Sequence, residues 1–137
     1  MADQITITAS VAAPIAKVWQ YWTEPAHIMQ WNNASPDWHT PRATNDLREG
    51  GTFTARMETK DGSMGFDFGG TYSTIVPEKE IAYAMGDDRK VRILFEAKGN
   101  ETLVTESFDP EQENSLEMQR AGWQSILDNF KRYAESQ

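Results

Sequence analysis

The sequence predicts an α+β fold in which a curved antiparallel sheet of about six or seven strands wraps around one long C-terminal helix. Three observations lead to this prediction. Segments of alternating apolar and polar residues are separated by short turn sequences, which is typical of antiparallel hairpins. The last segment carries apolar residues at helical spacing. Glycine pairs at 50–51 and 69–70 give the sheet places to bend.

The first elements are a strand followed by two short helices. Residues 5–11, ITITASV, alternate apolar and polar side chains and are rich in β-branched residues, so they predict a strand with one buried face. Pro14 and Pro25 each open a segment with apolar residues at helical spacing, and proline is well suited to a first helical turn. We therefore expect short helices over residues 14–22 and 24–31.

Six further strands and a long helix make up the rest of the predicted fold. We expect residues 32–41 to be irregular, with strands over 42–47, 51–59, 65–76, 80–85, 90–98 and 101–108. Residues 114–136 predict an amphipathic helix with Asn114 or Ser115 as N-cap. Its expected apolar stripe contains Leu116, Trp123, Ile126, Leu127 and Phe130. Only this helix is long enough to cover the sheet. A length of 137 residues is about that of one domain, so we expect a single domain over residues 1–137.

The composition argues against several functional classes. A net charge of -8 disfavours binding to nucleic acid. The chain has no cysteine and only two histidines, without metal-ligand spacing, so we expect neither a metal nor a cofactor. No apolar run reaches the roughly 18 residues of a membrane span, and the N-terminus lacks the features of a signal peptide. We therefore expect a cytoplasmic protein with no membrane span.

The glycine pair in DLREGGTF, residues 46–53, could belong to a phosphate-binding loop or to a hairpin. A phosphate-binding loop requires a helix N-terminus directly after the glycines. Here TFTARMET follows, which is a strand sequence. The hairpin interpretation is therefore favoured, with the glycines supplying positive φ in the turn. For Gly69 and Gly70, inside a strand, we expect a bulge or a sharp bend.

Several of these segments together resemble a known family. DLREGGTF, the following Asp-Gly turn, GGTYSTIVPEKEIAYAM at 69–85 and AGWQSILDNFKRYAE at 121–135 are similar to the activator of Hsp90 ATPase homologue 1-like domains. That family belongs to the START-like superfamily, also called SRPBCC or helix-grip. The resemblance covers nearly the whole chain. It implies a cavity between the sheet and the long helix, often large enough for an apolar ligand, without implying one particular activity.

The resemblance also raises the question of a chaperone partner. The eukaryotic activator resembles this chain only in its C-terminal part, and its separate N-terminal domain carries an Asn-rich, Trp-His-Trp signature. WNNASPDWH, residues 31–39, shares some residue types with that signature but not its spacing. We therefore favour an apolar small molecule as the partner over an Hsp90-type chaperone.

Large aromatic residues predict the wall of the cavity. Strand alternation places several of them on one face, and methionines are adaptable fillers beside them. His39 is added because the family fold could bring its loop to the cavity mouth. The candidate ligand contacts are Trp31, His39, Phe53, Met57, Phe66, Phe68, Tyr83, Phe95, Trp123 and Leu127.

Charged residues of the strands are weaker candidates. Alternation points Asp67 and Arg56 outward, and Arg48 is expected to pair with a nearby carboxylate or turn carbonyl. The pattern does not settle which face Glu106 takes, although a buried Glu there could have a raised pKa and act as an acid or base.

The prediction that follows is binding of an apolar or amphipathic small molecule, with no catalytic step assigned. No serine lies in a Gly-x-Ser-x-Gly motif, so a hydrolase nucleophile lacks support. The alternatives are an enzyme of unknown reaction using the same cavity, or a protein-interaction module such as a chaperone partner.

Overall fold

The computed structural model describes residues 4–33 and 35–137. Its elements in chain order are β1 (Ile5–Val11), α1 (Ile15–Thr23), α2 (Pro25–Trp31), β2 (Trp38–Asn45), β3 (Thr52–Thr59), β4 (Gly65–Val76), β5 (Glu80–Ala84), β6 (Lys90–Lys98), β7 (Glu101–Phe108) and α3 (Leu116–Glu135).

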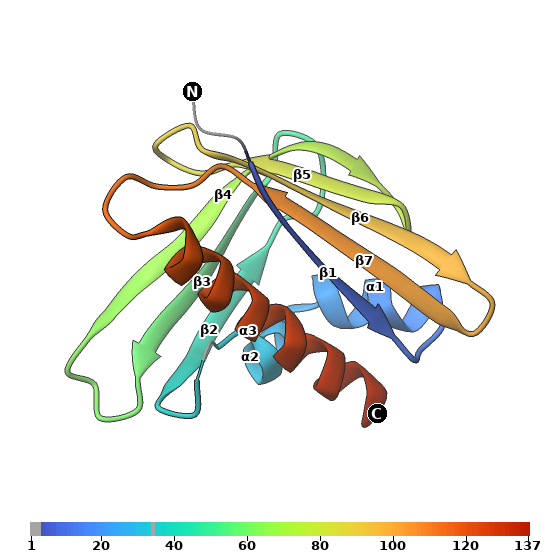
Figure 1. Cartoon of the computed structure of the whole chain (residues 1–137), viewed down its shortest axis with the longest axis horizontal. Helices are drawn as coiled ribbons and strands as arrows, with labels where there is room; N and C mark the ends of the chain where they lie inside the picture. The colour runs from blue at the N-terminus through green and yellow to red at the C-terminus, as the bar shows by residue number, and fades with distance from the viewer. Residues whose placement is uncertain (1–3, 34) are drawn as a thin grey trace.

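The strands form one antiparallel sheet in the order β1-β7-β6-β5-β4-β3-β2. The sheet curls into a half-barrel, and α3 crosses its concave side (Figure 1). The two short helices lie between β1 and β2 in the chain, and both contact α3. The predicted α+β class, the seven strands and the long C-terminal helix are therefore confirmed.

Helix α3 runs along the edge strand β1 and binds its free carbonyl groups. Arg120, Gln124 and Lys131 donate side-chain hydrogen bonds to the carbonyl oxygens of residues 6, 8 and 10, at 2.8, 3.2 and 2.7 Å. An edge strand presents unpaired backbone groups that can recruit another chain. Through these three contacts, α3 covers the β1 edge of the sheet.

The apolar stripe of α3 starts later than the sequence predicts. Ser115 is the N-cap, and its hydroxyl accepts from the Met118 amide at 3.1 Å. Leu116 is 55% exposed, so its assignment to the buried stripe is wrong. Gln119 turns inward instead, because its amide group bonds to the backbone of Glu111, which leads into the helix. Leu127 and Phe130, both almost fully buried, anchor the helix to the core.

Strand β2 begins at Trp38, inside the stretch expected to be irregular. Pro41 argues against a central strand here, because proline lacks the backbone N–H that pairing on both sides requires. Here β2 is the outer strand of the sheet, and its pairing with β3 shifts register between His39 and Arg42. The edge position accommodates the proline.

The glycine pair at 50–51 lies in the β2–β3 connection, as predicted, but its two members act differently. Gly50 has φ +85°, which glycine adopts without strain. Gly51 has no positive φ, and a Cβ there would lie 2.2 Å from the Asp46 carbonyl oxygen. The backbone can turn this closely only without a side chain at position 51.

Of the bulge or sharp bend expected at Gly69 and Gly70, the bulge is not found in the pairing with β3. Both residues pair in regular register with β3, and the shift falls later, between Tyr72 and Thr74 in the pairing with β5. A Cβ on Gly70 would meet the Ala84 carbonyl oxygen at 2.7 Å. Close strand approach, rather than a bulge, explains this glycine.

Candidate functional site

A cavity of about 300 Å³ lies between the concave face of the sheet and the helices. Every strand from β2 to β7 and all three helices contribute to its wall. The lining residues are Trp22, Thr23, Ile28, Trp31, Asn32, Ala43, Thr44, Phe53, Thr54, Ala55, Met57, Phe66, Phe68, Tyr72, Ile81, Tyr83, Met85, Arg89, Ile93, Glu106, Trp123 and Ile126.

Seven of the ten candidate contacts named from the sequence lie in this wall. They come from the short helix α2, the neighbouring strands β3, β4 and β5, and the long helix α3. They are Trp31, Phe53, Met57, Phe66, Phe68, Tyr83 and Trp123.

The other three candidates lie outside the cavity wall. Phe95 shares a sheet face with lining residues but sits under α1, with its ring 5.4 Å from that of Trp19. Leu127 is 1% exposed and belongs to the packed core. His39 lies in the register shift of β2, where its Nε2 is 3.5 Å from a Glu58 carboxylate oxygen. Side-chain alternation identifies a face of the sheet, but not the position along the strand where the cavity opens.

Aromatic rings build the wall through edge-to-face and stacked contacts with one another. Phe53 lies 4.7 Å from Tyr83 and 5.2 Å from Tyr72 between ring centroids. On the opposite side Trp123 stacks on Phe108 at 3.9 Å. Such ring pairs stabilise beyond the area they bury and fix the ring positions. The cavity is therefore bounded by rings held in place by their neighbours.

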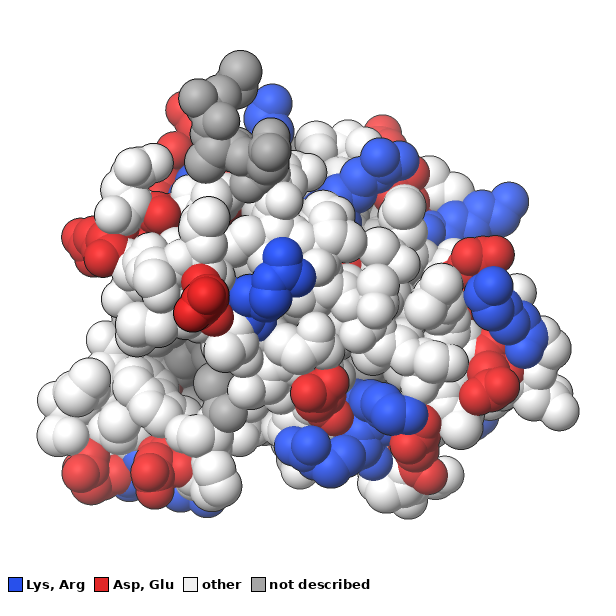
Figure 2. Space-filling view, viewed as in Figure 1, with Lys and Arg blue, Asp and Glu red and all other residues white. Residues whose placement is uncertain are grey.

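One side of the cavity reaches the surface near the β3–β4 hairpin. Phe66 of β4 is 48% exposed although it lines the cavity, and its ring lies 6.0 Å from that of Trp38. In Figure 2 the described atoms between this hairpin and α3 belong mainly to uncharged residues. Phe66 and Trp38 thus lie beside the open side of the cavity.

Glu106 is the acidic residue in the wall. It lies on β7 between the inward-facing Val104 and Phe108, and only 7% of it is exposed. Burial raises the pKa of its carboxyl group to about 8, because the charged form is poorly solvated there. The sequence did not determine which face of the sheet Glu106 takes, and the structure shows that its side chain points inward.

Two tyrosines stand on the same face of the sheet. The Tyr72 hydroxyl donates to Asn45 Oδ1 at 2.5 Å, and Tyr72 pairs with Tyr83 across β4 and β5. Burial raises the pKa of Tyr83 well above its usual value, and the negative charge of Glu106 raises it further. Both hydroxyl groups therefore stay protonated at neutral pH.

Arg89 also lines the cavity, from the turn between β5 and β6. Its side chain is 29% exposed, and its Nε lies 2.7 Å from an Asp87 carboxylate oxygen. The sequence did not identify this inward arginine, because it falls in a polar turn. Its charge is already paired with Asp87.

Other lining residues were missed although a signal was present. Tyr72 has the same strand parity as Phe66 and Phe68, so alternation placed it inward. Glu106 shares the parity of Val104, but the apolar Leu103 falls on the opposite parity, so the pattern left its face open. Trp22 belongs to the helical stripe of α1, but a stripe does not reveal which of its residues meets a cavity.

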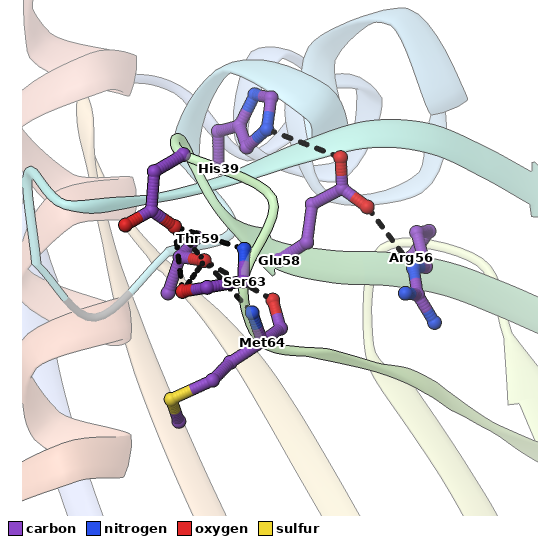
Figure 3. Close-up of polar contacts among 7 residues, drawn as sticks. His39, Arg56, Glu58, Thr59, Ser63 and Met64 are labelled. Atoms are coloured by element: carbon purple, nitrogen blue, oxygen red, sulfur yellow. Dashed lines mark hydrogen bonds and ion pairs between the residues drawn. The ribbon is translucent and has the colours of Figure 1, made fainter.

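The charged strand residues outside the cavity form a surface network (Figure 3). Glu58 lies between Arg56, at 3.2 Å, and His39, while Arg56 also reaches Asp67. The next turn is held by Asp61, which accepts from Ser63 and Thr59. These hydrogen bonds lower the pKa of Asp61 to about 2. The Glu58 group joins β3 to β2 and β4, and the Asp61 group closes the β3–β4 hairpin.

Arg48 forms an ion pair with Asp46, with its Nε 2.9 Å from a carboxylate oxygen.

Within residues 4–33 and 35–137, no group of three or more His, Asp or Glu side chains is placed to hold a metal ion. In that same part of the chain no helix is both long and apolar enough to cross a membrane.

Comparison with known proteins gives a family and several close folds. Residues 12–135 match the family model described as Activator of Hsp90 ATPase homolog 1-like protein. The solution structure of an AHSA1-like protein from Aeromonas hydrophila is 42% identical, with a TM-score of 0.88 over 96% of this chain and 93% of that chain. A solution structure from Cytophaga hutchinsonii is 55% identical, with a TM-score of 0.85 over 98% and 94%.

A crystal structure of a protein from Nitrosomonas europaea has a TM-score of 0.84 over 98% of this chain and 95% of that one, and its 19% identity supports the fold alone. The comparison with curated proteins gave no match.

Proposed function

The chain belongs to the family of Activator of Hsp90 ATPase homolog 1-like proteins, and on that premise we propose that it binds an uncharged apolar or amphipathic small molecule in the cavity under α3. The START-like fold of this family is known for ligand binding. The fold therefore supports ligand binding. The kind of ligand is inferred from the residues that line the cavity of this chain.

The observation that carries the proposal is the aromatic lining of an internal space. A cavity of about 300 Å³ reaches the lower end of the usual size of small-molecule sites, and such sites are mostly apolar with a few polar groups. Tightly packed cores leave few voids larger than a water molecule. An apolar ligand would bury its own surface against these rings and gain the corresponding hydrophobic free energy.

Electrostatics favours a ligand without a negative charge. The chain carries a net charge of -8, and the cavity wall contains the buried Glu106. An anion in this space would lose its hydration and lie near a carboxyl group. Arg89 offers little compensation, because its guanidinium group is paired with Asp87. We expect fatty-acid carboxylates to bind more weakly than neutral analogues of equal length.

The proposal is tested by displacing a neutral, environment-sensitive apolar dye from the purified protein. Ala55 lies in the wall and is 4% exposed, so Ala55→Leu adds atoms to the cavity. Dye affinity should fall at least about tenfold, since the added atoms occupy the space of the ligand. Ala121→Leu adds the same atoms to the exposed side of α3 and should leave dye binding unchanged. A folded wild type that never binds the dye would refute the proposal.

A further inference from the structure

We propose that Glu106 donates a hydrogen bond to the bound molecule, so that the cavity selects neutral apolar ligands that carry a hydrogen-bond acceptor such as a carbonyl oxygen. The inference rests on the proposed ligand-binding function and specifies the chemistry of the ligand.

Glu106 lies in an apolar environment that gives its carboxyl group no protein partner. Its neighbours in the sheet are Ile93 of β6 and Ile7 of β1, both almost fully buried. Desolvation is the sole cause of its altered pKa, and no hydrogen bond or ion pair joins its carboxyl group to another described residue. A buried polar group without a partner is unusual in a folded protein.

The carboxyl oxygens are accessible from the cavity. Among residues 4–33 and 35–137, every fully enclosed side-chain nitrogen or oxygen has a hydrogen-bond partner. The unpartnered carboxyl of Glu106 is therefore not sealed within the protein, and Glu106 is one of the lining residues. Its polar atoms are open to whatever occupies the cavity.

The carboxyl group is protonated at neutral pH, because burial raises its pKa to about 8. A protonated carboxyl group has one O–H donor as well as acceptor capacity, whereas the carboxylate only accepts. In this state Glu106 can donate to a carbonyl oxygen inside an otherwise apolar space.

The other ionisable groups of the wall do not titrate near this pH. Tyr83 of β5 and Tyr72 of β4 both have raised pKa values, so they stay neutral. Arg89 is paired with Asp87 at 2.7 Å. The described lining residues from α1, α2, α3, β2, β3 and β6 carry no ionisable side chain. A change in binding around pH 8 is therefore attributable to Glu106.

An ammonium ligand is a weaker match than a neutral acceptor. It would require an ionised Glu106, and burying two opposite charges loses the hydration of both, which their attraction often fails to repay. A neutral acceptor engages the protonated form that burial favours. The ammonium alternative is nevertheless distinguishable, because its binding would strengthen as pH rises toward 8.

The test compares 2-acetylnaphthalene with 2-ethylnaphthalene, which have similar shapes but differ in the carbonyl group. Affinities are measured by isothermal titration calorimetry at pH 6 and pH 9.5, and the readout is the ratio of the two. We expect the ketone to bind about tenfold more tightly at pH 6, as one hydrogen bond to a buried donor allows. This preference should largely disappear at pH 9.5, where Glu106 is ionised.

Two variants separate the hydrogen bond from the packing. Glu106→Gln keeps an N–H donor of similar size, so its preference for the ketone should persist at both pH values. Glu106→Leu has no donor, so it should bind both naphthalenes with no preference. Circular dichroism and a cooperative unfolding transition show that each variant is folded.

Several results would overturn the inference. Equal affinities for the ketone and the hydrocarbon in wild type at pH 6, or a preference that is the same at pH 9.5, would exclude donation by Glu106 and leave the proposed function intact. Failure of both probes to bind would count against the proposed function as well. Tighter binding of 2-(aminomethyl)naphthalene than of the ketone, strengthening from pH 6 to pH 8 in wild type but not in Glu106→Gln, would replace the acceptor with a cation.

Discussion

Glu106 shows how burial changes the chemistry of a single side chain. On the protein surface a carboxyl group is ionised at neutral pH, whereas at this position burial raises the pKa from 4.5 to about 8. The folded state therefore binds a proton that the unfolded state releases above about pH 4.5. Protonation of Glu106 and stability of the fold are linked.

The first prediction concerns this linkage. The stability that a protonated Glu106 contributes is fully present below about pH 4.5 and is lost as pH rises to about 8. Glu106→Gln does not titrate, so between pH 4.5 and pH 8.5 it should gain up to about 5 kcal/mol of unfolding free energy relative to wild type. Urea unfolding at both pH values measures the difference. Parallel pH profiles of the two proteins would contradict it.

The second prediction concerns Gly51. Alanine at this position would place its Cβ 2.2 Å from the backbone oxygen of Asp46, so the β2–β3 turn would have to shift. We expect Gly51→Ala to lower the free energy of unfolding by roughly 2 kcal/mol or more. Gly86→Ala is the control, because a Cβ there meets nothing within 4 Å and φ is not positive. Equal stability of the two variants in urea unfolding would show that the turn adapts without cost.

At the scale of single residues, the sequence predicted which face of the sheet a side chain takes better than it predicted what surrounds that side chain. Period-two alternation placed Phe53, Met57 and Tyr83 on the inner face. The same rule did not settle the face of Glu106, because apolar residues of β7 fall on both parities, with Leu103 on one and Val104 on the other. Its lack of a partner depends on neighbours from three strands, which no local pattern contains.

At the scale of elements, α3 has two parts with different tasks. Its C-terminal half carries the fully buried Phe130, whose ring lies 4.8 Å from Trp22 and 4.9 Å from Trp31. Its N-terminal half presents Trp123 to the cavity, half-buried and stacked on Phe108. The C-terminal half of α3 packs into the core, and the N-terminal half covers the cavity.

The third prediction follows from this division. Phe130→Ala removes a ring that is packed on all sides and should cost about 3–5 kcal/mol of unfolding free energy. Trp123→Ala removes a half-buried ring beside existing space and should cost clearly less, while weakening dye binding. Urea unfolding of both variants gives the comparison. A larger loss for Trp123→Ala would mean that the cavity end of α3 is the main anchor.

The element boundaries reveal what tertiary contacts add to local sequence. Residues 38–41 were expected to be irregular, yet they are part of a strand, and the edge position of β2 accommodates Pro41. Leu116 fitted the helical period but lies in a first turn where Gln119 faces inward. Both predictions were wrong because contacts with neighbouring elements, and not the local pattern, decided the outcome.

At the scale of the whole molecule, the cavity exists because the curled sheet and α3 do not close completely on one another. The sequence allowed a prediction of curvature, of the covering helix and of most aromatic wall residues. It did not allow a prediction of which part of the space stays open. Phe95 shows this most clearly: it faces inward like Ile93, but α1 fills the space beside it. The distance between layers is a property of all elements together.

The last prediction uses the whole fold as the reporter of binding. A molecule that binds only the folded state stabilises it by RT ln(1 + [L]/Kd), which is about 2.7 kcal/mol at one hundred times Kd. For a domain of this size the melting temperature should then rise by roughly 10 °C with 2-acetylnaphthalene at pH 6. In Ala55→Leu, where the cavity is partly filled, the rise should be much smaller, whereas Ala121→Leu should behave as wild type. Differential scanning calorimetry measures all three, and an undiminished rise in Ala55→Leu would place the bound molecule outside the cavity.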